Sequence, residues 1–406
     1  MAIPLCPHFG PCGGCDWQHL SYPEQLDRKR TQLADLLRAT LGNHTPPVDA
    51  IIGMAVDDTG WPWEFRHKAS FAFGESPDRR NSVMGHYAAR SQRVVAIVEC
   101  PVHASRANRL AFALHAHLVR ARVTAAGPRL RGILRHLIVR TTRDGREAVA
   151  MLVVTRNDKS LRTPIRALLA GPEAPDGFFL NIHDRPGPYM VGRETIRIAG
   201  RSQVRQSVGG VSFLISPTAF FQTNVEAAEI LVGLVLEHAA DRPPMRILDL
   251  YAGSGLFTLP LAARGHHVTS VEDNDQAMKD ADANVRLNRI PSAAVRLHAS
   301  RVEDVVQRLG RETFDLAILD PPRQGCPPEV IDAVFGRLRP PRVIYVSCNP
   351  ETLAEELPHI LDEGYQIRRV QPVDMFPHTT HIETVVTLDT AIDPESSRTN
   401  IRGGYP

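Results

Sequence analysis

The sequence predicts an α/β protein whose carboxyl-terminal part is a doubly wound parallel sheet, preceded by an α+β region. Two observations lead to this prediction. From Arg246 onward, short apolar runs rich in β-branched residues alternate with helical patterns, as in sheets built from strand–helix–strand units. Earlier in the chain, strand-like runs at 133–141 and 147–155 flank a turn at 143–146, which is typical of a β-hairpin.

The main elements follow in order along the chain. Residues 21–41 and 105–121 have apolar side chains at helical spacing. Ser216-Pro217-Thr218 has the composition of a helix start, with an apolar helix running to about Ala240. The strands predicted for the sheet are Arg246–Tyr251, Val268–Glu272, Phe314–Leu319 and Val343–Ser347, and the last strands are Gln366–Pro372 and Glu383–Leu388.

These elements divide the 406 residues into regions, since a chain of this length suggests two or three domains. We expect an amino-terminal, cysteine-containing region at 1–105 and a β-rich central region at 106–215 that is continuous with it. The parallel sheet would occupy 216–392. The polar tail at 393–406 is expected to be disordered.

Composition excludes several classes of protein. Hydrophobic content of 43% and charged content of 23% fit a soluble globular chain. The sequence has no apolar run of membrane-spanning length and no signal peptide, so we expect a cytoplasmic protein. The net charge of +2 argues neither for nor against a nucleic-acid partner. Arginines cluster between residues 129 and 146 and suit phosphate contacts, although a GC-rich genome explains the arginine excess equally well.

A glycine loop follows the first strand of the predicted sheet. In Asp249-Leu-Tyr-Ala-Gly-Ser-Gly255, the two glycines let backbone amides approach a ligand closely. Glu272 ends the next strand, where a carboxylate can accept hydrogen bonds from a ribose diol. A dinucleotide site has the same outline, but Thr258 stands at the last glycine position of that fingerprint. A glycine turn that serves packing alone is the remaining alternative.

Three loops should converge at the carboxyl edge of the sheet: 320–325, 347–350 and 376–383. They bring a thiol, Cys348, toward a carboxylate, Glu383. A thiol at a strand end is either a small buried hydrophobe or a nucleophile. One reaction that needs this pair is methylation of uracil C5, in which a thiolate adds at C6 and a general base later removes the C5 proton.

The motifs in these loops resemble those of known methyltransferases. Residues 249–255 resemble motif I of S-adenosylmethionine methyltransferases. Asp320-Pro-Pro-Arg-Gln-Gly325, Ser347-Cys-Asn-Pro350 and the segment 376–383 look like the signature of the RNA uracil-5-methyltransferases. Cytosine-5 enzymes that act on DNA place their cysteine after the fourth strand, and those that act on RNA use two cysteines, whereas this chain has a single cysteine after the fifth. Cys326 lies out of place for such a pair and is expected to be a bystander.

The resemblance also implies roles for other residues. Phe220-Phe-Gln222-Thr-Asn224 matches the family, and Leu256 departs from it, since some members carry Asn there. Asp320 would lie at the reacting end of the cofactor, and Arg323 would favour the thiolate or bind RNA phosphate. The resemblance implies Cys348 as nucleophile and Glu383 as base. Phe220, packed on the extruded base, and Arg323 would contact the substrate. The residues implied for S-adenosylmethionine binding are Gln222, Tyr251, Gly253, Gly255, Glu272 and Asp320.

Cysteines near the start of the chain predict a metal site. Cys6, Cys12 and Cys15 have C-x5-C-x2-C spacing, and Cys100 would complete a set of four thiolates. Such a set suits zinc or an iron–sulfur cluster, and spacing alone does not separate them. The segment 6–20 is similar to the [4Fe-4S] segment of the ribosomal RNA branch of the same family, and this resemblance implies a [4Fe-4S] cluster with a structural role.

Taken together, these features predict an S-adenosylmethionine-dependent enzyme that forms 5-methyluridine in 23S ribosomal RNA and acts as a monomer. A tRNA uracil-5-methyltransferase and a non-catalytic iron–sulfur RNA-binding protein are the alternatives. Many members of the ribosomal RNA branch carry a small RNA-binding β-barrel before the cysteines, and we expect it to be absent here. RNA contact would then fall on the central arginines: Arg131, Arg135, Arg140 and Arg143.

Overall fold

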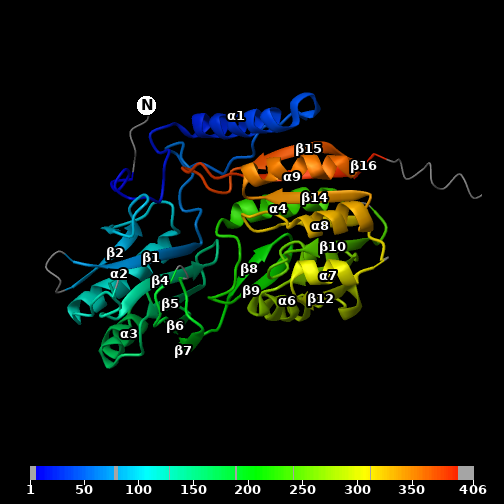
Figure 1. Cartoon of the computed structure of the whole chain (residues 1–406). Helices are drawn as coiled ribbons and strands as arrows, with labels where there is room; N and C mark the ends of the chain where they lie inside the picture. The colour runs from blue at the N-terminus through cyan, green and yellow to red at the C-terminus, as the bar shows by residue number, and fades with distance from the viewer. Residues whose placement is uncertain are drawn as a thin grey trace, which may run out of the picture.

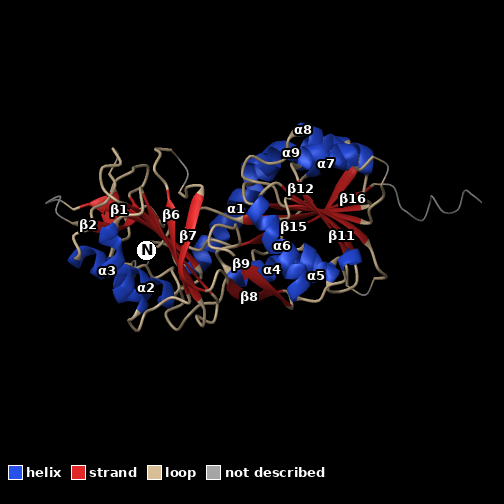
Figure 2. Cartoon of the chain, turned by 90° about the horizontal axis from the view of Figure 1, so that it is seen from below, coloured by secondary structure: helices blue, strands red, loops and turns tan. Residues whose placement is uncertain are grey.

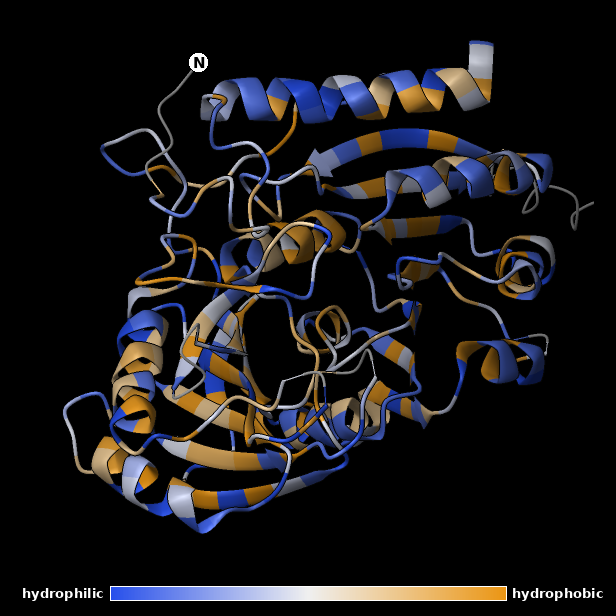
Figure 3. Cartoon of the chain, turned by 60° about the vertical axis from the view of Figure 1, so that its left-hand side comes forward, coloured by the Kyte–Doolittle hydropathy of each residue, from blue (hydrophilic) through white to orange (hydrophobic). Residues whose placement is uncertain are grey.

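The described part of the chain contains two seven-stranded sheets, a two-stranded ribbon and the helices that pack on the sheets (Figure 1). The structure is a computed structural model, and it describes residues 6–76, 81–127, 129–187, 190–240, 242–310 and 312–391. The predicted tail at 393–406 lies outside the described residues. Hydrophobic and hydrophilic residues alternate along several of the strands (Figure 3).

The first sheet holds the amino-terminal half of the chain, and its strand order is β3-β2-β1-β4-β5-β6-β7. The hairpin predicted around 143–146 is confirmed, because β4 and β5 pair antiparallel up to Thr141 and Ala148. Helices α2 (Ser105–Arg120) and α3 (Arg162–Leu169) contribute apolar side chains to the core of this sheet. Its strands are β1 (Lys68–Glu75), β2 (Ser82–Tyr87), β3 (Val94–Ala96), β4 (Leu134–Thr141), β5 (Ala148–Val154), β6 (Gly177–Ile182) and β7 (Glu194–Gly200).

The second sheet confirms the predicted doubly wound arrangement. Its order is β12-β11-β10-β13-β14-β16-β15; the first five strands run parallel, and β16 is antiparallel to both of its neighbours. Chain order reverses between β10 and β13, which is where such sheets bind ligands. The strands are β10 (Arg246–Leu250), β11 (His267–Glu272), β12 (Val295–Ala299), β13 (Leu316–Leu319), β14 (Arg342–Ser347), β15 (Tyr365–Val373) and β16 (Glu383–Thr390).

Helices cover both faces of the second sheet (Figure 2). Side chains that alternate along a strand enter opposite cores: Ile247 packs with α4 and α5, whereas Leu248 packs with α7, α8 and α9. The helices are α4 (Val225–Glu237), α5 (Thr258–Ala262), α6 (Asp275–Leu287), α7 (Val302–Arg308), α8 (Pro328–Ile331) and α9 (Pro350–Asp362). The remaining elements are the ribbon β8 (Val204–Val208) and β9 (Val211–Ile215), the 3-10 turns η1 (Gly42–His44), η2 (Lys159–Leu161) and η3 (Ser292–Ala294), and the π-helical η4 (Asp332–Leu338).

Two features differ from the expectations. The helix start expected at Ser216-Pro217-Thr218 is wrong, because α4 begins at Val225 and Asn224 caps it by accepting a hydrogen bond from Ala227 N at 3.1 Å. The segment 216–224 instead crosses between the two sheets without helical structure. Strand β12, the third strand of the second sheet along the chain, was not predicted.

The predicted helix at 21–41 is confirmed as α1 (Tyr22–Leu41), and it lies against α9 rather than against the first sheet (Figure 1). The chain behind it pairs with the edge strand β15 through Val48 and Ile52. The cysteine segment that precedes α1 binds the first sheet instead, where Gly13 N donates to Tyr87 O at 3.0 Å. The amino-terminal region therefore contacts both sheets.

Direct hydrogen bonds join the first sheet to the segment before α4. His67 N donates to Thr223 O at 2.8 Å, and Arg140 Nη2 donates to Ala219 O at 2.9 Å. Among the described residues, no helix has both the length and the apolar character that crossing a membrane requires.

Candidate active site

Cys348 and Glu383 are neighbours across two strands of the second sheet. Cys348 directly follows β14, and Glu383 is the first residue of β16. In the antiparallel register Ser347 pairs with Thr384, so the next position on each strand places Cys348 opposite Glu383. Asp320 follows β13, the other neighbour of β14. The three loops therefore meet at the carboxyl edge, as the sequence predicts.

Negative charge and loss of solvent dominate this site. The pKa of Cys348 rises to about 11, mainly because of burial and also because of the charges of Glu383 and Asp320. Arg323 lowers this pKa, but its effect is smaller. Burial also raises the pKa of Glu383 well above its usual range, and the Asp320 charge adds to this. The pKa of Asp320 rises to about 7 through lost solvation and the charges of Asp249 and Glu272. Arg323 therefore favours the thiolate, as expected, but burial and the two carboxyl groups outweigh it.

Arg323 is the positive group of the site. Its Nη2 lies 3.0 Å from His381 Nδ1, and its side chain is exposed. Its backbone oxygen accepts hydrogen bonds from Asn349 Nδ2 at 2.9 Å and Thr352 Oγ1 at 3.2 Å. These bonds tie the loop after β13 to the loop that carries Cys348. Glu383 and Asp320 both lie near Cys348, and a positively charged ligand would favour their ionised forms.

The glycine loop has the backbone geometry of a ligand-binding loop. Tyr251, Gly253 and Gly255 have positive φ angles of 62°, 55° and 89°, which turn the chain sharply after β10. Glu272 Oε2 accepts a hydrogen bond from Gly253 N at 2.9 Å, which places the acidic residue against the loop. The Tyr251 hydroxyl is directed into the protein beside Cys326, so any ligand contact from Tyr251 would come from its ring or backbone.

Thr258 explains the missing glycine of the dinucleotide fingerprint. Its Oγ1 donates to Asp249 Oδ2 at 2.5 Å, and both residues are buried. Burial is also the main reason why the pKa of Asp249 rises to about 7, although this hydrogen bond opposes the rise. A glycine at 258 would leave that carboxyl without this donor, so threonine fits this loop better.

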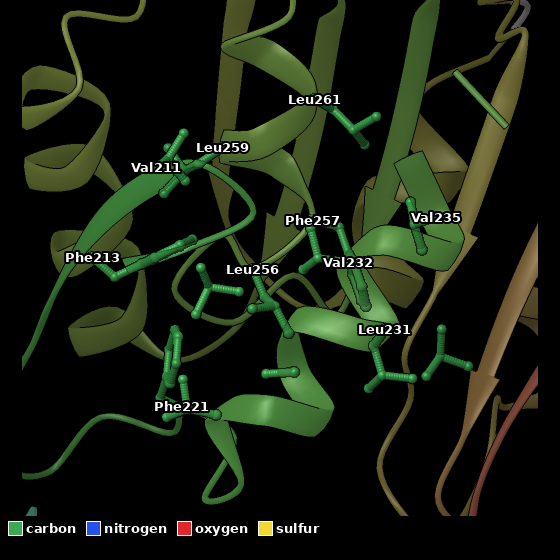
Figure 4. Packing of buried hydrophobic residues seen from close by; sticks show 14 of the residues in the cluster. Val211, Phe213, Phe221, Leu231, Val232, Val235, Leu256, Phe257, Leu259 and Leu261 are labelled. Atoms are coloured by element: carbon green, nitrogen blue, oxygen red, sulfur yellow. The ribbon is translucent and has the colours of Figure 1, made fainter. Parts of the chain in front are cut away.

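Adjacent phenylalanines before α4 have opposite environments. Phe221 is 4% exposed and packs against Phe213 with tilted rings whose centres are 5.3 Å apart, near Leu256 (Figure 4). Phe220 is 62% exposed, and Ser254 Oγ of the glycine loop donates to its backbone oxygen at 3.3 Å. Phe221 thus anchors the segment, and Phe220 presents a free aromatic ring beside the glycine loop. Gln222, the next residue, is buried.

The four predicted metal-binding cysteines line one cavity of about 480 Å³. Burial is the main reason why the pKa of Cys15 rises to about 11 and that of Cys100 to about 12, and neighbouring thiols of the set contribute to both increases. Among the described residues that line this cavity there is no carboxylate, whereas Arg66 and Lys68 are present. Sulfur donors without carboxylates suit a soft metal or cluster.

Two histidines share this cavity and were missed by the sequence reasoning. Ligand atoms of His86, Cys100 and His103 lie within 4.8 Å of one another. His86 Nε2 and His103 Nδ1 are buried without a hydrogen-bond partner. Cys100 and His103 have C-x2-H spacing, which is common in metal sites, whereas His86 lies far from them in sequence and is brought close by the pairing of β2 with β3.

The central arginines differ in how far their side chains are exposed to an RNA partner. Arg140 is buried, so it does not lie on a surface that RNA reaches. Arg135 Nη1 donates to the backbone oxygens of His183 and Arg185 at 2.8 and 2.7 Å. Arg131 is exposed, and Arg143 lies 3.5 Å from Glu226 with half of its side chain exposed. The expectation for Arg140 is therefore wrong, and Arg131 and Arg143 stay available.

A doubly wound sheet with an antiparallel strand β16 between β14 and β15, a glycine loop after its first strand and an acidic residue at the end of its second agrees with the class of S-adenosylmethionine-dependent methyltransferases. The family model described as tRNA (Uracil-5-)-methyltransferase matches residues 193–391. The chain belongs to the RNA uracil-5-methyltransferase family, and it is an S-adenosylmethionine-dependent enzyme.

Similar proteins cover nearly the whole chain. A protein of Gloeobacter violaceus described as an uncharacterized RNA methyltransferase is 35% identical over 387 residues, which is 95% of this chain and 82% of the relative. One of Caldanaerobacter subterraneus with the same description is 32% identical over 390 residues, 95% and 84% of the two chains. The Pyrococcus abyssi tRNA (uracil-54, C5)-methyltransferase, solved with S-adenosyl-L-homocysteine, is 27% identical with a TM-score of 0.76, covering 93% of this chain and 86% of that one.

Proposed function

We propose that the enzyme transfers a methyl group from S-adenosylmethionine to C5 of a uridine in 23S ribosomal RNA through a covalent adduct with Cys348. The observation that carries this proposal is the position of Cys348 opposite Glu383, at the sheet edge that also holds the glycine loop. A nucleophile and a base at one edge are what uracil C5 methylation needs.

The chemical steps follow from these two side chains. Cys348 Sγ forms a bond to uracil C6, and the displaced electron pair makes C5 nucleophilic. C5 then takes the methyl group as the sulfonium carbon–sulfur bond breaks. Glu383 accepts the C5 proton, the C5–C6 double bond re-forms, and Cys348 Sγ leaves. The positive charge of the sulfonium suits the carboxyl-rich site and would oppose the rise in the thiol pKa that burial, Glu383 and Asp320 cause.

Other residues would hold the two substrates. Gly253, Gly255, Glu272, Gln222 and Tyr251 would bind S-adenosylmethionine, with Asp320 near its reacting end. The exposed Phe220 ring would pack against the target base once that base leaves its stack. Arg323, exposed at the same edge, would bind an RNA phosphate.

We further propose that Cys6, Cys12, Cys15 and Cys100 hold a [4Fe-4S] cluster, which would fasten the amino-terminal segment beside the first sheet. Zinc bound by thiolates at about 2.3 Å needs sulfurs roughly 3.8 Å apart. No three of these sulfurs, all in described residues, lie within 4.8 Å of one another, and this wider spacing supports a larger group. Zinc on His86, Cys100 and His103 is the second candidate. Iron, sulfide and zinc analysis of anaerobically purified protein separates the two.

The RNA target has two candidates. The ribosomal target rests on the resemblance of the cysteine segment to the ribosomal RNA branch, whereas the similar Pyrococcus abyssi enzyme is named for tRNA. Unmodified 23S ribosomal RNA and tRNA transcripts, each incubated with the enzyme and labelled S-adenosylmethionine, decide between them. Labelling of the 23S ribosomal RNA transcript is the expected result. Labelling of tRNA alone would reject the ribosomal target.

A further inference from the structure

The loop that leads into Glu383 is held by a helix from the other end of the chain. This loop, residues 374–382, joins β15 to β16, and we call it the base loop because Glu383 follows it. In Figure 1, α1 lies beside β15 and β16. Three residues of α1, Tyr22, Gln25 and Lys29, bind the base loop through hydrogen bonds or an ion pair.

Lys29 binds the base loop at its beginning, its middle and its end. Its Nζ lies 2.5 Å from Asp374 Oδ1, 3.0 Å from Phe376 O and 2.7 Å from His381 O. An ammonium group has three N–H donors, so all of them are used within this loop. The side chains of Lys29 and Asp374 have 0% exposure, and Tyr22 donates to the second Asp374 oxygen at 2.8 Å.

The role of this buried ion pair is explained better by the positions that it fixes in the base loop than by a gain in the stability of the fold. Well-packed apolar side chains of similar volume often stabilise a fold as much as a buried ion pair does. Apolar side chains do not, however, fix two backbone carbonyls in chosen positions. The bonds from Lys29 to Phe376 O and His381 O do fix them, and His381 lies two residues before Glu383.

Gln25 holds the centre of the base loop and connects it to the cysteine segment. Its Oε1 accepts a hydrogen bond from His378 N at 2.9 Å, and its Nε2 donates to Trp17 O at 3.0 Å. Asp16 N and Trp17 N both donate to His378 O, at 2.8 and 3.0 Å. The two residues that follow Cys15 therefore bind the same loop.

His378 has a conformation that its surroundings must impose. It is fully buried and has a φ of 66°, which is unfavourable for a residue other than glycine. Its ring packs against three aromatic rings, with centre distances of 5.3 Å to Trp61, 4.6 Å to Trp63 and 6.2 Å to Phe65. Its Nε2 lies 3.1 Å from Pro62 O. The base loop is thus held in a strained shape by α1, the cysteine segment and these aromatic rings.

We propose that Lys29 and Gln25 are positioning residues that keep Glu383 within reach of the proton on uracil C5. Neither contacts the substrate, and the inference rests on the proposed role of Glu383 as base. The base acts only after the methyl group has been transferred. A loosened base loop should therefore slow the release of the covalent adduct while Cys348 still forms it.

The test compares two variants with a control on the same helix. Lys29→Met combined with Asp374→Asn removes the charge pair without leaving a buried charge, and Gln25→Leu loosens the loop with no change of charge. Arg30→Met is the matched control, because Arg30 donates to Val48 O and Asp49 O, outside the base loop. Single-turnover reactions use whichever RNA the unmodified enzyme methylates, and denaturing gels measure covalent adduct and methylated product.

We expect the adduct-to-product ratio to rise at least about 10-fold in both test variants, since displacement of a catalytic group by 1 Å can cost about 100-fold in rate. The control should keep the original ratio. Thermal melting identifies a variant that fails to fold, in which case the other one carries the test. Unchanged ratios in the folded variants, with Glu383→Gln trapping the adduct, would reject the positioning role alone. If Glu383→Gln traps no adduct, the role of Glu383 and this inference both fail.

Discussion

Cys348 lies opposite Glu383, one position beyond the Ser347–Thr384 pair of β14 and β16. The nucleophile and the base of the proposed reaction therefore share one stretch of antiparallel register. Each also affects the ionisation of the other, because a negative charge on Glu383 raises the pKa of the thiol. Two predictions concern this pair.

The first prediction is that Cys348 of the free enzyme reacts slowly with alkylating agents. With its pKa raised to about 11, its thiolate population at pH 8 is about 100-fold below that of a free thiol. The alkylation rate should rise as the pH increases through the thiol pKa. Glu383→Gln removes a negative charge and should move the profile to lower pH. Mass spectrometry of the Cys348 peptide measures both, and a profile that matches a free thiol would contradict the expectation.

The second prediction separates the roles of nucleophile and base. Cys348→Ala should abolish both methyl transfer and the covalent adduct with 5-fluorouridine RNA. Glu383→Gln should keep the adduct but lower product release about 10²- to 10⁴-fold, the range that general bases contribute. Binding of S-adenosylmethionine serves as the control, since neither change alters the glycine loop. Turnover by Cys348→Ala would remove this residue from the mechanism.

The third prediction contrasts the adjacent phenylalanines. Phe221→Ala should lower the free energy of unfolding by about 3–5 kcal/mol, because it leaves a cavity beside Phe213. Phe220→Ala should change it by less than about 0.5 kcal/mol, since the ring is exposed. Phe220→Ala should instead weaken methylation of RNA. Denaturant unfolding and RNA kinetics test the pair, and equal stability losses would contradict the assignment.

The fourth prediction concerns the metal site. Cys100→Ser should reduce iron and sulfide in anaerobically purified protein, because the cluster loses one of its four proposed ligands. Cys326→Ser is the matched control: Cys326 is also a free cysteine, but it is buried beside Tyr251 and outside the cavity. Full iron content in Cys100→Ser would exclude Cys100 as a ligand.

The fifth prediction is acid sensitivity from buried histidines. Burial lowers the pKa of His67, His136 and His378 to about 4, from an ordinary value of about 6.5. Between these values the unfolded chain binds more protons, so stability falls as the pH falls. Each histidine should cost about 2 kcal/mol at pH 5 relative to pH 7. Melting curves measure the loss, and His136→Gln should reduce it; equal stability at both pH values would contradict the prediction.

Local patterns predicted much of the second sheet and the loops at its edge. A short apolar run predicts each strand, and the residues directly after it, Asp320 or Cys348-Asn349-Pro350, mark the end of the strand and supply the reactive side chain. Strand β12 was not predicted because it lies half-exposed at the sheet edge, and polar residues such as Arg296 and His298 separate its apolar ones.

Other features depend on partners far along the chain. The helix signal at Ser216-Pro217-Thr218 is overridden because Phe221 is buried and Ala219 O accepts from Arg140 of the first sheet. Lys29 and Asp374 are 345 residues apart, and no periodicity links them. The pattern of α1 predicts its helix but cannot show which loop its charged side chain binds.

The place of β16 in the second sheet has a consequence for synthesis. Of the described strands, β16 is made last, yet it lies between β14 and β15, which are made earlier. A nascent chain that stops before residue 383 leaves both of these strands with open edges, which favour aggregation. The same strand brings Glu383 to the site. A product truncated before residue 383 therefore lacks both the strand that completes the sheet and the base.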